Sequence, residues 1–269
     1  MRRRDLRSTL EGEIPAALLQ DVPNRFDVIG DIAIASIPPS LAEYRFQIAK
    51  TIANRRGNIK TVLNKISLVQ GDHRVSEFEI LLGESTVTTH REYKHRYNLD
   101  VSEVFFNSRL SFERQRVMSQ VQKGENILVP FCGVGPFVIP AAARGANVLG
   151  IEKNPAACKW LFENIYLNNV SSKVDLICAD ALDIPNMVKS RFDRIIIPIP
   201  YGMDFFFELL SPLAKKEGFL HFYTFKVAGE IESIKENFSE LGYEILGVRR
   251  CGNVASGVSR WVFDLQKHI

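Results

Sequence analysis

One stretch of the chain decides the expected fold: Asn126-Ile127-Leu128-Val129-Pro130-Phe131-Cys132-Gly133-Val134-Gly135-Pro136-Phe137. Residues 126–129 predict a buried strand, because a short apolar run that ends at turn residues is typical of a strand covered on both faces. Glycines after such a strand let the backbone approach a ligand and leave the N–H groups of the next helix facing it. The stretch therefore predicts a ligand-binding turn, although a turn that needs glycine for its own geometry would look the same.

The next two strands bring acidic residues to the same edge of the sheet. Asn147 to Ile151 is expected to be the second strand, and it leads into Glu152, about twenty residues beyond the glycine turn, where a carboxylate can accept both hydroxyls of a ribose. Asn154-Pro155 then starts a helix, because proline suits a first helical turn. The third strand, Val174 to Cys178, leads to Asp180, where an adenine amino group would lie in this topology. A lone aspartate after a strand is common, but three converging strand ends predict a nucleoside-bearing cofactor.

From about residue 101, strands alternate with helix-length amphipathic segments, which is typical of a parallel doubly wound sheet. Ser111 is expected to cap a helix that runs to about Gln122. Further strands are expected at Arg194 to Ile199, Leu220 to Phe225, Tyr243 to Val248 and Val258 to Leu265. The last two would form an antiparallel hairpin around Cys251-Gly252-Asn253. Residues 101–269 are therefore expected to be a Rossmann-like α/β domain.

Residues 1–100 predict a separate, small α+β domain. Gly30-Asp31 lies between two runs rich in β-branched residues, which indicates a hairpin. Ser40 is expected to cap a helix that Gly57 closes. Short strands are expected at Thr61 to Leu63, Glu77 to Leu82, Thr86 to His90 and Arg96 to Leu99.

The composition is that of a globular protein. With 269 residues, of which 46% are hydrophobic and 24% charged, the chain can bury a core and does not predict disorder. It has no apolar run of roughly 18 residues and no signal peptide after Met1, so a cytoplasmic protein without a membrane segment is expected. The net charge of +3 does not decide whether nucleic acid binds. Basic clusters at residues 2–4, 50–56 and 91–96 fit either a solvated surface or contacts with an RNA backbone.

The four cysteines, Cys132, Cys158, Cys178 and Cys251, are far apart. The absence of any C-x-x-C pair argues against a zinc knuckle or a thioredoxin-like motif, and no metal is expected. Buried free thiols are the expected state, with a nucleophilic role for Cys132 as the alternative because it lies in the glycine turn.

Several segments carry a resemblance to a known family: Phe106-Asn107-Ser108-Arg109-Leu110-Ser111-Phe112-Glu113-Arg114, the loop from Phe131 to Phe137, Glu152-Lys153-Asn154-Pro155, Glu163-Asn164-Ile165 with Leu167-Asn168, and His221-Phe222-Tyr223-Thr224. They resemble the archaeal and eukaryal tRNA (guanine-N1)-methyltransferases, which modify the guanosine 3′ of the anticodon, position 37. The related wyosine-pathway aminocarboxypropyl transferases share part of the pattern. The resemblance runs from about Leu6 to the C-terminus. It implies a class I methyltransferase sheet, S-adenosylmethionine as cofactor, tRNA as partner and a monomer.

The resemblance also implies roles for particular residues. Those that would hold S-adenosylmethionine are Phe131, Gly133, Gly135, Glu152, Asp180 and Ala181. Glu113 would be the general base and Arg74 would stabilise negative charge on guanine O6. Arg109 and Arg114 would position the base or phosphate, and Pro198 and Tyr201 would lie where the substrate base binds.

The role of Glu113 has a chemical reason. Guanine N1 is a poor nucleophile while it keeps its proton, so a carboxylate must accept that proton as the methyl group arrives. The other interpretation is that Glu113 is a first-turn carboxylate that stabilises the helix dipole behind Ser111.

Two positions depart from the family pattern. Val129 stands where the family usually has an aspartate at the end of the first strand, which removes a polar contact to the methionine end of the cofactor. Pro198 stands where the family has the asparagine of an Asn-Leu-Pro motif, while Pro200-Tyr201 keeps part of a turn in which an aromatic ring stacks on a flipped base. The chain also begins close to the small domain, without the extra N-terminal domain of some archaeal members, so weaker recognition of the whole tRNA is expected.

These departures leave two further hypotheses beside methyl transfer to a tRNA guanine. The first keeps the cofactor and changes the reaction, to another RNA position, a protein side chain or aminocarboxypropyl transfer. The second is an inactive paralogue that binds RNA or cofactor as a partner subunit.

Overall fold

The computed structural model describes residues 5–66 and 76–268. The chain divides into two compact units, Met1–Ser108 and Arg109–Ile269, which are described separately below. The division therefore lies after Ser108, whereas the sequence analysis placed it after residue 100.

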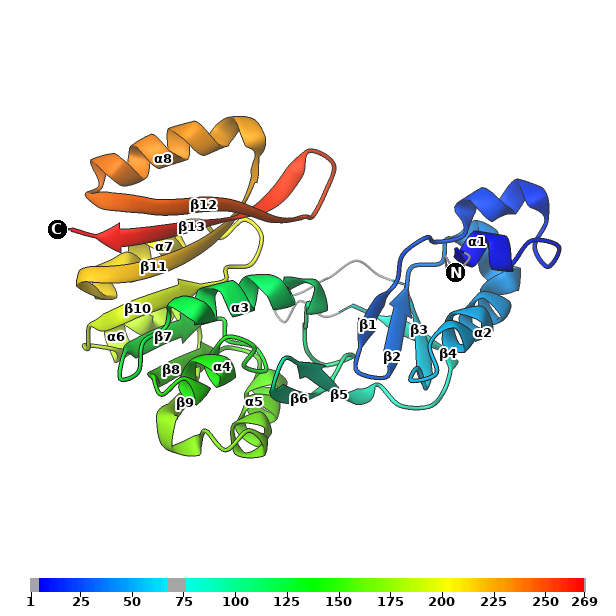
Figure 1. Ribbon diagram of the computed structural model, residues 1–269, viewed down its shortest axis with the longest axis horizontal. Coiled ribbons are helices and arrows are strands. Elements are labelled where there is room, and N and C mark those ends of the chain that lie inside the picture. Colours follow the sequence, from blue (N-terminus) through cyan, green and yellow to red (C-terminus); the bar gives the residue numbers. More distant parts are fainter. Residues whose placement is uncertain (1–4, 67–75, 269) are drawn as a thin grey trace. The chain divides into compact units, whose positions relative to one another are not determined.

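The first unit is built on a four-stranded sheet in the order β1-β2-β3-β4 (Figure 1). Its elements are α1 (Leu6–Thr9), η1 (Ala16–Asp21), β1 (Asp27–Ile29), β2 (Ile32–Ala35), η2 (Pro39–Tyr44), α2 (Arg45–Arg55), β3 (Thr61–Lys65) and β4 (Phe78–Leu82). The β1–β2 hairpin around Gly30-Asp31 is confirmed. Because β3 runs parallel to β2, the chain crosses over between them through α2, whose Ile48 and Ile52 are fully buried.

The expected helix cap at Ser40 is wrong. Ser40 lies inside the 3-10 turn η2, where its hydroxyl donates to Oδ2 of Asp21 at 2.8 Å instead of accepting from the helix. Pro39 is the reason, since its fixed φ already starts the turn one residue earlier.

A two-stranded hairpin, β5 (Val87–Glu92) and β6 (His95–Asp100), completes the first unit. The backbone N–H of Gly30 donates to Nδ1 of His90 at 3.1 Å, and that of Asp31 donates to Oγ1 of Thr88 at 3.1 Å. These bonds join the hairpin to the β1–β2 turn, so the hairpin belongs to the first unit.

The second unit contains a seven-stranded sheet in the order β12-β13-β11-β10-β7-β8-β9 (Figure 1). Its strands are β7 (Asn126–Pro130), β8 (Asn147–Glu152), β9 (Val174–Cys178), β10 (Phe192–Ile197), β11 (Ala214–Val227), β12 (Tyr243–Asn253) and β13 (Val258–Lys267). β13 is antiparallel to both neighbours, and the other adjacent pairs are parallel. The chain order reverses at β7, as in a doubly wound sheet, and this confirms the Rossmann-like α/β fold.

The helices of this unit cover both faces of the sheet. They are η3 (Ser108–Leu110), α3 (Ser111–Gln120), α4 (Val138–Ala143), α5 (Pro155–Leu167), η4 (Ser171–Lys173), η5 (Ala181–Asp183), α6 (Ile184–Met187), α7 (Phe206–Leu210), η6 (Ser211–Leu213), η7 (Ala228–Glu230) and α8 (Ile231–Glu240). Residues of α6, α7 and α8 share a hydrophobic cluster with Leu220, Phe222 and Phe263. Because strand side chains alternate between faces, His221 and Tyr223 lie on the opposite face, beneath α3.

Three further expectations have mixed outcomes. Ser111 is the first helical residue of α3 and caps nothing, because the 3-10 turn η3 leads directly into the helix. Asn154 caps α5 by accepting from the N–H of Ala156, with Pro155 in the first turn as expected. The terminal hairpin forms, but Cys251 still belongs to β12, so its turn lies at residues 254–257.

The four cysteines differ in burial. Cys132 and Cys158 are buried, but Cys178 is exposed and Cys251 is half-buried, so the expectation of four buried thiols is wrong for the last two. Within residues 5–66 and 76–268, no helix is long and apolar enough to cross a membrane. Over the same residues, no cluster of histidine, cysteine and acidic side chains has the grouping of a metal site.

Candidate active site

The glycine turn after β7 has three residues in the left-handed backbone region, which glycine adopts most readily. Phe131, Gly133 and Gly135 have φ angles of 54°, 54° and 95°. A Cβ added at Gly135 would lie 2.4 Å from Cδ1 of Leu161, so this glycine lets the turn pack against α5. A Cβ added at Gly133 would meet no atom within 4 Å, so this glycine borders open space.

Glu152, at the end of β8, is bound to this turn. Its Oε2 accepts from the N–H of Gly133 at 2.8 Å, and its Oε1 accepts from the N–H of Asn154 at 2.9 Å. A carboxylate oxygen can accept more than one hydrogen bond, so acceptor capacity remains on both atoms. The prediction that the first two strand ends converge is confirmed by the contact between Glu152 and Gly133.

Asp180 follows β9, the neighbour of β8. Its Oδ1 accepts from the N–H of Leu182 at 3.0 Å, and its Oδ2 pairs with Nζ of Lys153 at 2.9 Å. The hydrogen bond from Leu182 and then the ammonium of Lys153 lower the pKa of this carboxyl below its ordinary value. Ala181, the next residue, is buried. Asp180 therefore stays ionised at the sheet edge next to Glu152's strand.

These residues fit an adenosyl cofactor. Open space beside Gly133 would let a ligand come close to the backbone of the turn. The carboxylates of Glu152 and Asp180 offer hydrogen-bond acceptors at the ends of the neighbouring strands. The side chain of Val129 is apolar and fully buried, so it can offer no polar contact to the methionine end of the cofactor.

The residues after β10 form a partly exposed aromatic edge. Pro198 is half-buried, and the ring of Tyr201 is 62% exposed. The Tyr201 ring lies 5.4 Å from the ring of Phe225 on β11, and Phe205 is also exposed. An exposed ring held on one side is suited to stacking with a nucleobase.

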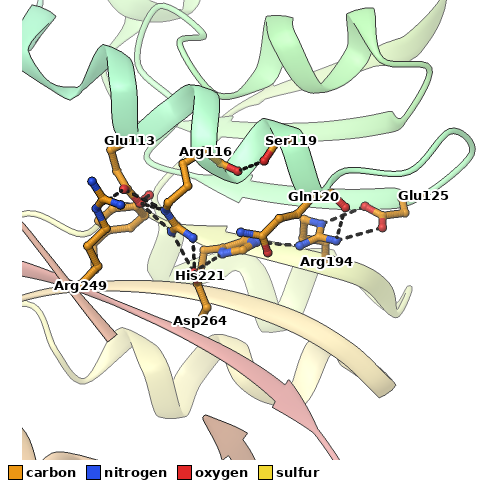
Figure 2. A network of polar contacts seen from close by, with 10 residues as sticks. Glu113, Arg116, Ser119, Gln120, Glu125, Arg194, His221, Arg249 and Asp264 are labelled. Atoms are coloured by element: carbon orange, nitrogen blue, oxygen red, sulfur yellow. Dashed lines mark hydrogen bonds and ion pairs between the residues drawn. The ribbon is translucent and has the colours of Figure 1, made fainter. Parts of the chain in front are cut away.

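Glu113 lies in the first turn of α3 with only 4% of its surface exposed (Figure 2). Its Oε1 accepts from Nη2 of Arg116 at 2.7 Å and from the hydroxyl of Tyr223 at 3.0 Å. Its Oε2 accepts from Nε of Arg116 at 3.0 Å and lies 3.7 Å from Nε of Arg249. The Tyr223 ring contacts Phe137, which follows the glycine turn, with 5.8 Å between centroids. One aromatic contact therefore separates the tyrosine that holds Glu113 from the cofactor turn.

The other predicted arginines have different surroundings. Arg109 is exposed and Arg114 is buried, at 3% exposure. Their proposed contacts with base or phosphate stay predictions. Arg74 lies outside the described residues, so its proposed role also stays a prediction.

Sequence reasoning missed the partners of Glu113. Arg116 follows Glu113 by three positions on a helix, a spacing that places two side chains side by side. Tyr223 and His221 alternate with apolar residues in β11, so their polar groups point away from the hydrophobic cluster. Asp264 on β13 gives no comparable signal, because its pairing with β11 depends on the tertiary fold.

The strand order and the acidic strand tips define the class of protein: a Rossmann-like, nucleoside-cofactor-dependent methyltransferase fold. Residues 88–246 match the family described as the TRM5/TYW2 methyltransferase domain, and residues 6–86 match the TYW2 N-terminal domain. The chain therefore belongs to the TRM5/TYW2 family of S-adenosylmethionine-dependent tRNA-modifying enzymes.

Two curated relatives carry different activities. The tRNA (guanine(37)-N(1))-methyltransferase Trm5b of Pyrococcus abyssi is 36% identical over 90% of this chain and 74% of its own. The tRNA(Phe) (4-demethylwyosine(37)-C(7)) aminocarboxypropyltransferase of Pyrococcus horikoshii is 31% identical over 97% of this chain and 95% of its own.

Solved structures agree with both relationships. The crystal structure of Trm5b from Pyrococcus abyssi superposes with a TM-score of 0.85 at 35% identity and covers 95% of this chain and 78% of that one. The structure of P. horikoshii TYW2 in complex with MeSAdo has a TM-score of 0.77 at 30% identity and covers 97% of each chain.

Proposed function

We propose that the protein transfers the methyl group of S-adenosylmethionine to N1 of guanosine 37 of tRNA. The observation that carries the proposal is the buried carboxylate of Glu113, one aromatic contact from the cofactor turn. The relationship to a named tRNA (guanine(37)-N(1))-methyltransferase at 36% identity supports the same reaction.

The residues of this chain would divide the work as follows. Gly133, Glu152 and Asp180 hold the adenosyl part of the cofactor, which when bound supplies an electrophilic methyl group. Glu113 takes the proton of guanine N1, so the electron pair of the breaking N–H bond becomes available for the new N–C bond. Tyr201 offers an exposed ring on which a flipped base can stack.

A double-label experiment tests this proposal. Unmodified tRNA transcript is incubated with S-adenosylmethionine labelled in the methyl group or in the aminocarboxypropyl group, and the nucleosides are analysed by mass spectrometry. The proposal expects methyl label on N1 of guanosine 37. Saturable cofactor binding without transfer of either label would contradict it and favour the inactive paralogue.

Aminocarboxypropyl transfer is the second candidate. It is favoured by the match of residues 6–86 to the TYW2 N-terminal domain, and by a relative with that activity whose length this chain covers almost completely. The same experiment, repeated with tRNA carrying 4-demethylwyosine, separates the two reactions. Aminocarboxypropyl label on that nucleoside, with none on guanosine 37, would replace the first proposal by the second.

A further inference from the structure

A buried polar network beneath α3 continues from Glu113 to Glu125 (Figure 2). From Glu113 it passes through Arg116, Asp264, His221 and Arg194, which lie on α3, β13, β11 and β10. The proposed reaction uses only the first member directly. His221, Arg194 and Asp264 are buried, so an unpaired charge among these groups would be costly.

Arg194 fixes the proton position on His221. Guanidinium groups donate and never accept, so Nε2 of His221 must be the acceptor of its 2.7 Å contact with Nη1 of Arg194. The proton of the neutral ring is then on Nδ1, which donates to Oδ1 of Asp264 at 2.6 Å. Arg194 is itself held by both carboxylate oxygens of Glu125, at 2.9 and 3.0 Å. One tautomer of His221 therefore satisfies every contact.

Asp264 in turn fixes Arg116. Its Oδ2 accepts from Nη1 of Arg116, and its Oδ1 accepts from Nη2 at 3.0 Å. Nη1 and Nη2, at the end of the guanidinium, thus donate to Asp264. Nε and Nη2, along one side of the guanidinium, donate to Glu113. Because the guanidinium is planar, two carboxylates bound to adjacent edges are held at a fixed angle to each other.

The two carboxylate oxygens of Glu113 differ in the number of hydrogen bonds that they accept. Oε1 receives Nη2 of Arg116 and the hydroxyl of Tyr223, and Nε of Arg116 also lies 3.2 Å away. Among the described residues, Oε2 accepts a hydrogen bond only from Nε of Arg116, and it lies 3.7 Å from Nε of Arg249, whose side chain is 48% exposed. The oxygen with spare acceptor capacity is therefore the one that lies next to the partly exposed side chain of Arg249.

We propose that Arg116, held by Asp264, which His221 holds in turn, is a positioning residue that locks Oε1 of Glu113 and presents Oε2 as the atom that accepts the proton of the target nucleotide. This inference rests on the role of Glu113 in the proposed function.

The test compares D264N and R116K with the wild-type enzyme. In D264N, one amide must face donors on two sides, Arg116 and Nδ1–H of His221, so its NH2 group opposes a donor whichever way it is turned. In R116K, an ammonium cannot pair with two carboxylates along two edges. We expect kcat to fall between about tenfold and a hundredfold in both, since misplacing a reacting group by about 1 Å can cost a hundredfold. KM for tRNA and Kd for S-adenosylmethionine should stay unchanged.

The matched control is E232Q. Glu232 also pairs with a cation, Nζ of Lys235 at 2.8 Å, but lies on α8, away from the network. Its kcat should equal that of the wild type. Active-site titration with S-adenosylmethionine normalises each rate to folded protein. A normal kcat in D264N and R116K would overturn the proposal. So would a loss of activity that disappears once the rate is normalised to the amount of folded protein.

The comparison remains decisive if the proposed function fails. kcat is measured on whichever tRNA nucleoside the wild-type enzyme modifies. Modification of a nucleoside other than guanosine 37 would therefore contradict the proposed function, while the positioning role of Arg116 could still be tested. If the wild type transfers nothing, crystal structures of the wild type and D264N decide. A rotated Glu113 carboxylate in D264N supports the positioning role, and an unchanged carboxylate contradicts it.

Discussion

Two glycines separated by one residue serve different purposes in the turn after β7. Gly135 has α5 pressed against it, with Leu161 only 2.4 Å from the position of an added Cβ, whereas Gly133 faces open space. Gly135 therefore contributes to the stability of the fold, and Gly133 leaves room for a ligand.

We expect G135A to lower the free energy of unfolding by about 1–3 kcal/mol, because the added methyl group overpacks the contact with α5 and its φ of 95° is strained. G133A should cost less stability, about 1 kcal/mol, because only its φ is unfavourable. It should nevertheless weaken cofactor binding. Chemical denaturation and calorimetric titration measure the two quantities. Equal stability losses, with cofactor binding untouched in G133A, would refute this division.

E113Q tests the base directly. The amide keeps the size of the side chain but cannot take a proton, so kcat should fall by about a hundredfold or more, with Kd for S-adenosylmethionine unchanged. E232Q is the control, because Glu232 is exposed on α8 and, within the part of the chain that the structure describes, pairs only with Lys235. Single-turnover transfer to tRNA provides the rate, and a normal rate in E113Q would exclude Glu113 as the base.

The interface between α3 and the strands beneath it is polar, whereas most helix–sheet interfaces are apolar. Burial lowers the pKa of His221 below its ordinary value of 6.5, although Asp264 opposes the shift. Burial also opposes ionisation of Asp264, but hydrogen bonds from His221 and Arg116 outweigh it and lower the pKa of that carboxyl to about 2. Both groups therefore bind protons more weakly in the folded protein than in the unfolded chain.

This linkage predicts acid sensitivity. A depressed pKa in the folded state means that the unfolded chain binds more protons, so stability is lost as pH falls below about 6.5, by up to about 1.4 kcal/mol per pH unit for one proton. The free energy of unfolding should therefore decrease from pH 7 to pH 5. H221Q, which keeps a donor and an acceptor but cannot titrate, should show a shallower slope in urea denaturation. An unchanged slope in H221Q would contradict the assignment.

Sequence patterns predicted the strands and helices well, but they predicted helix caps and pairs of side chains distant in the sequence poorly. The strands and the convergence of Gly133 with Glu152 follow from local apolar periodicity and the rule that parallel strands end at one edge. The caps at Ser40 and Ser111 were wrong because 3-10 turns precede both helices. The pairing of Arg116 with Asp264 spans 148 positions, and no local pattern encodes it.

At the scale of the whole molecule, the strand tips from Phe131 to Ala181 all belong to the second unit. We expect residues 109–269, produced alone, to fold and bind S-adenosylmethionine with an affinity close to that of the full chain. Circular dichroism and calorimetric titration would measure this. A folded fragment that does not bind would show that the cofactor site needs residues of the first unit.

Calorimetric titration of S-adenosylmethionine into the wild type and E152A tests whether three neighbouring strand ends form the cofactor site. The wild type should bind one cofactor per chain. E152A should bind at least about tenfold more weakly, since a hydrogen bond to a charged group contributes about 1.5–3 kcal/mol. D175N, an exposed acidic position on β9, should bind normally. Absence of saturable binding in the wild type, or equal affinity in E152A, would contradict the account.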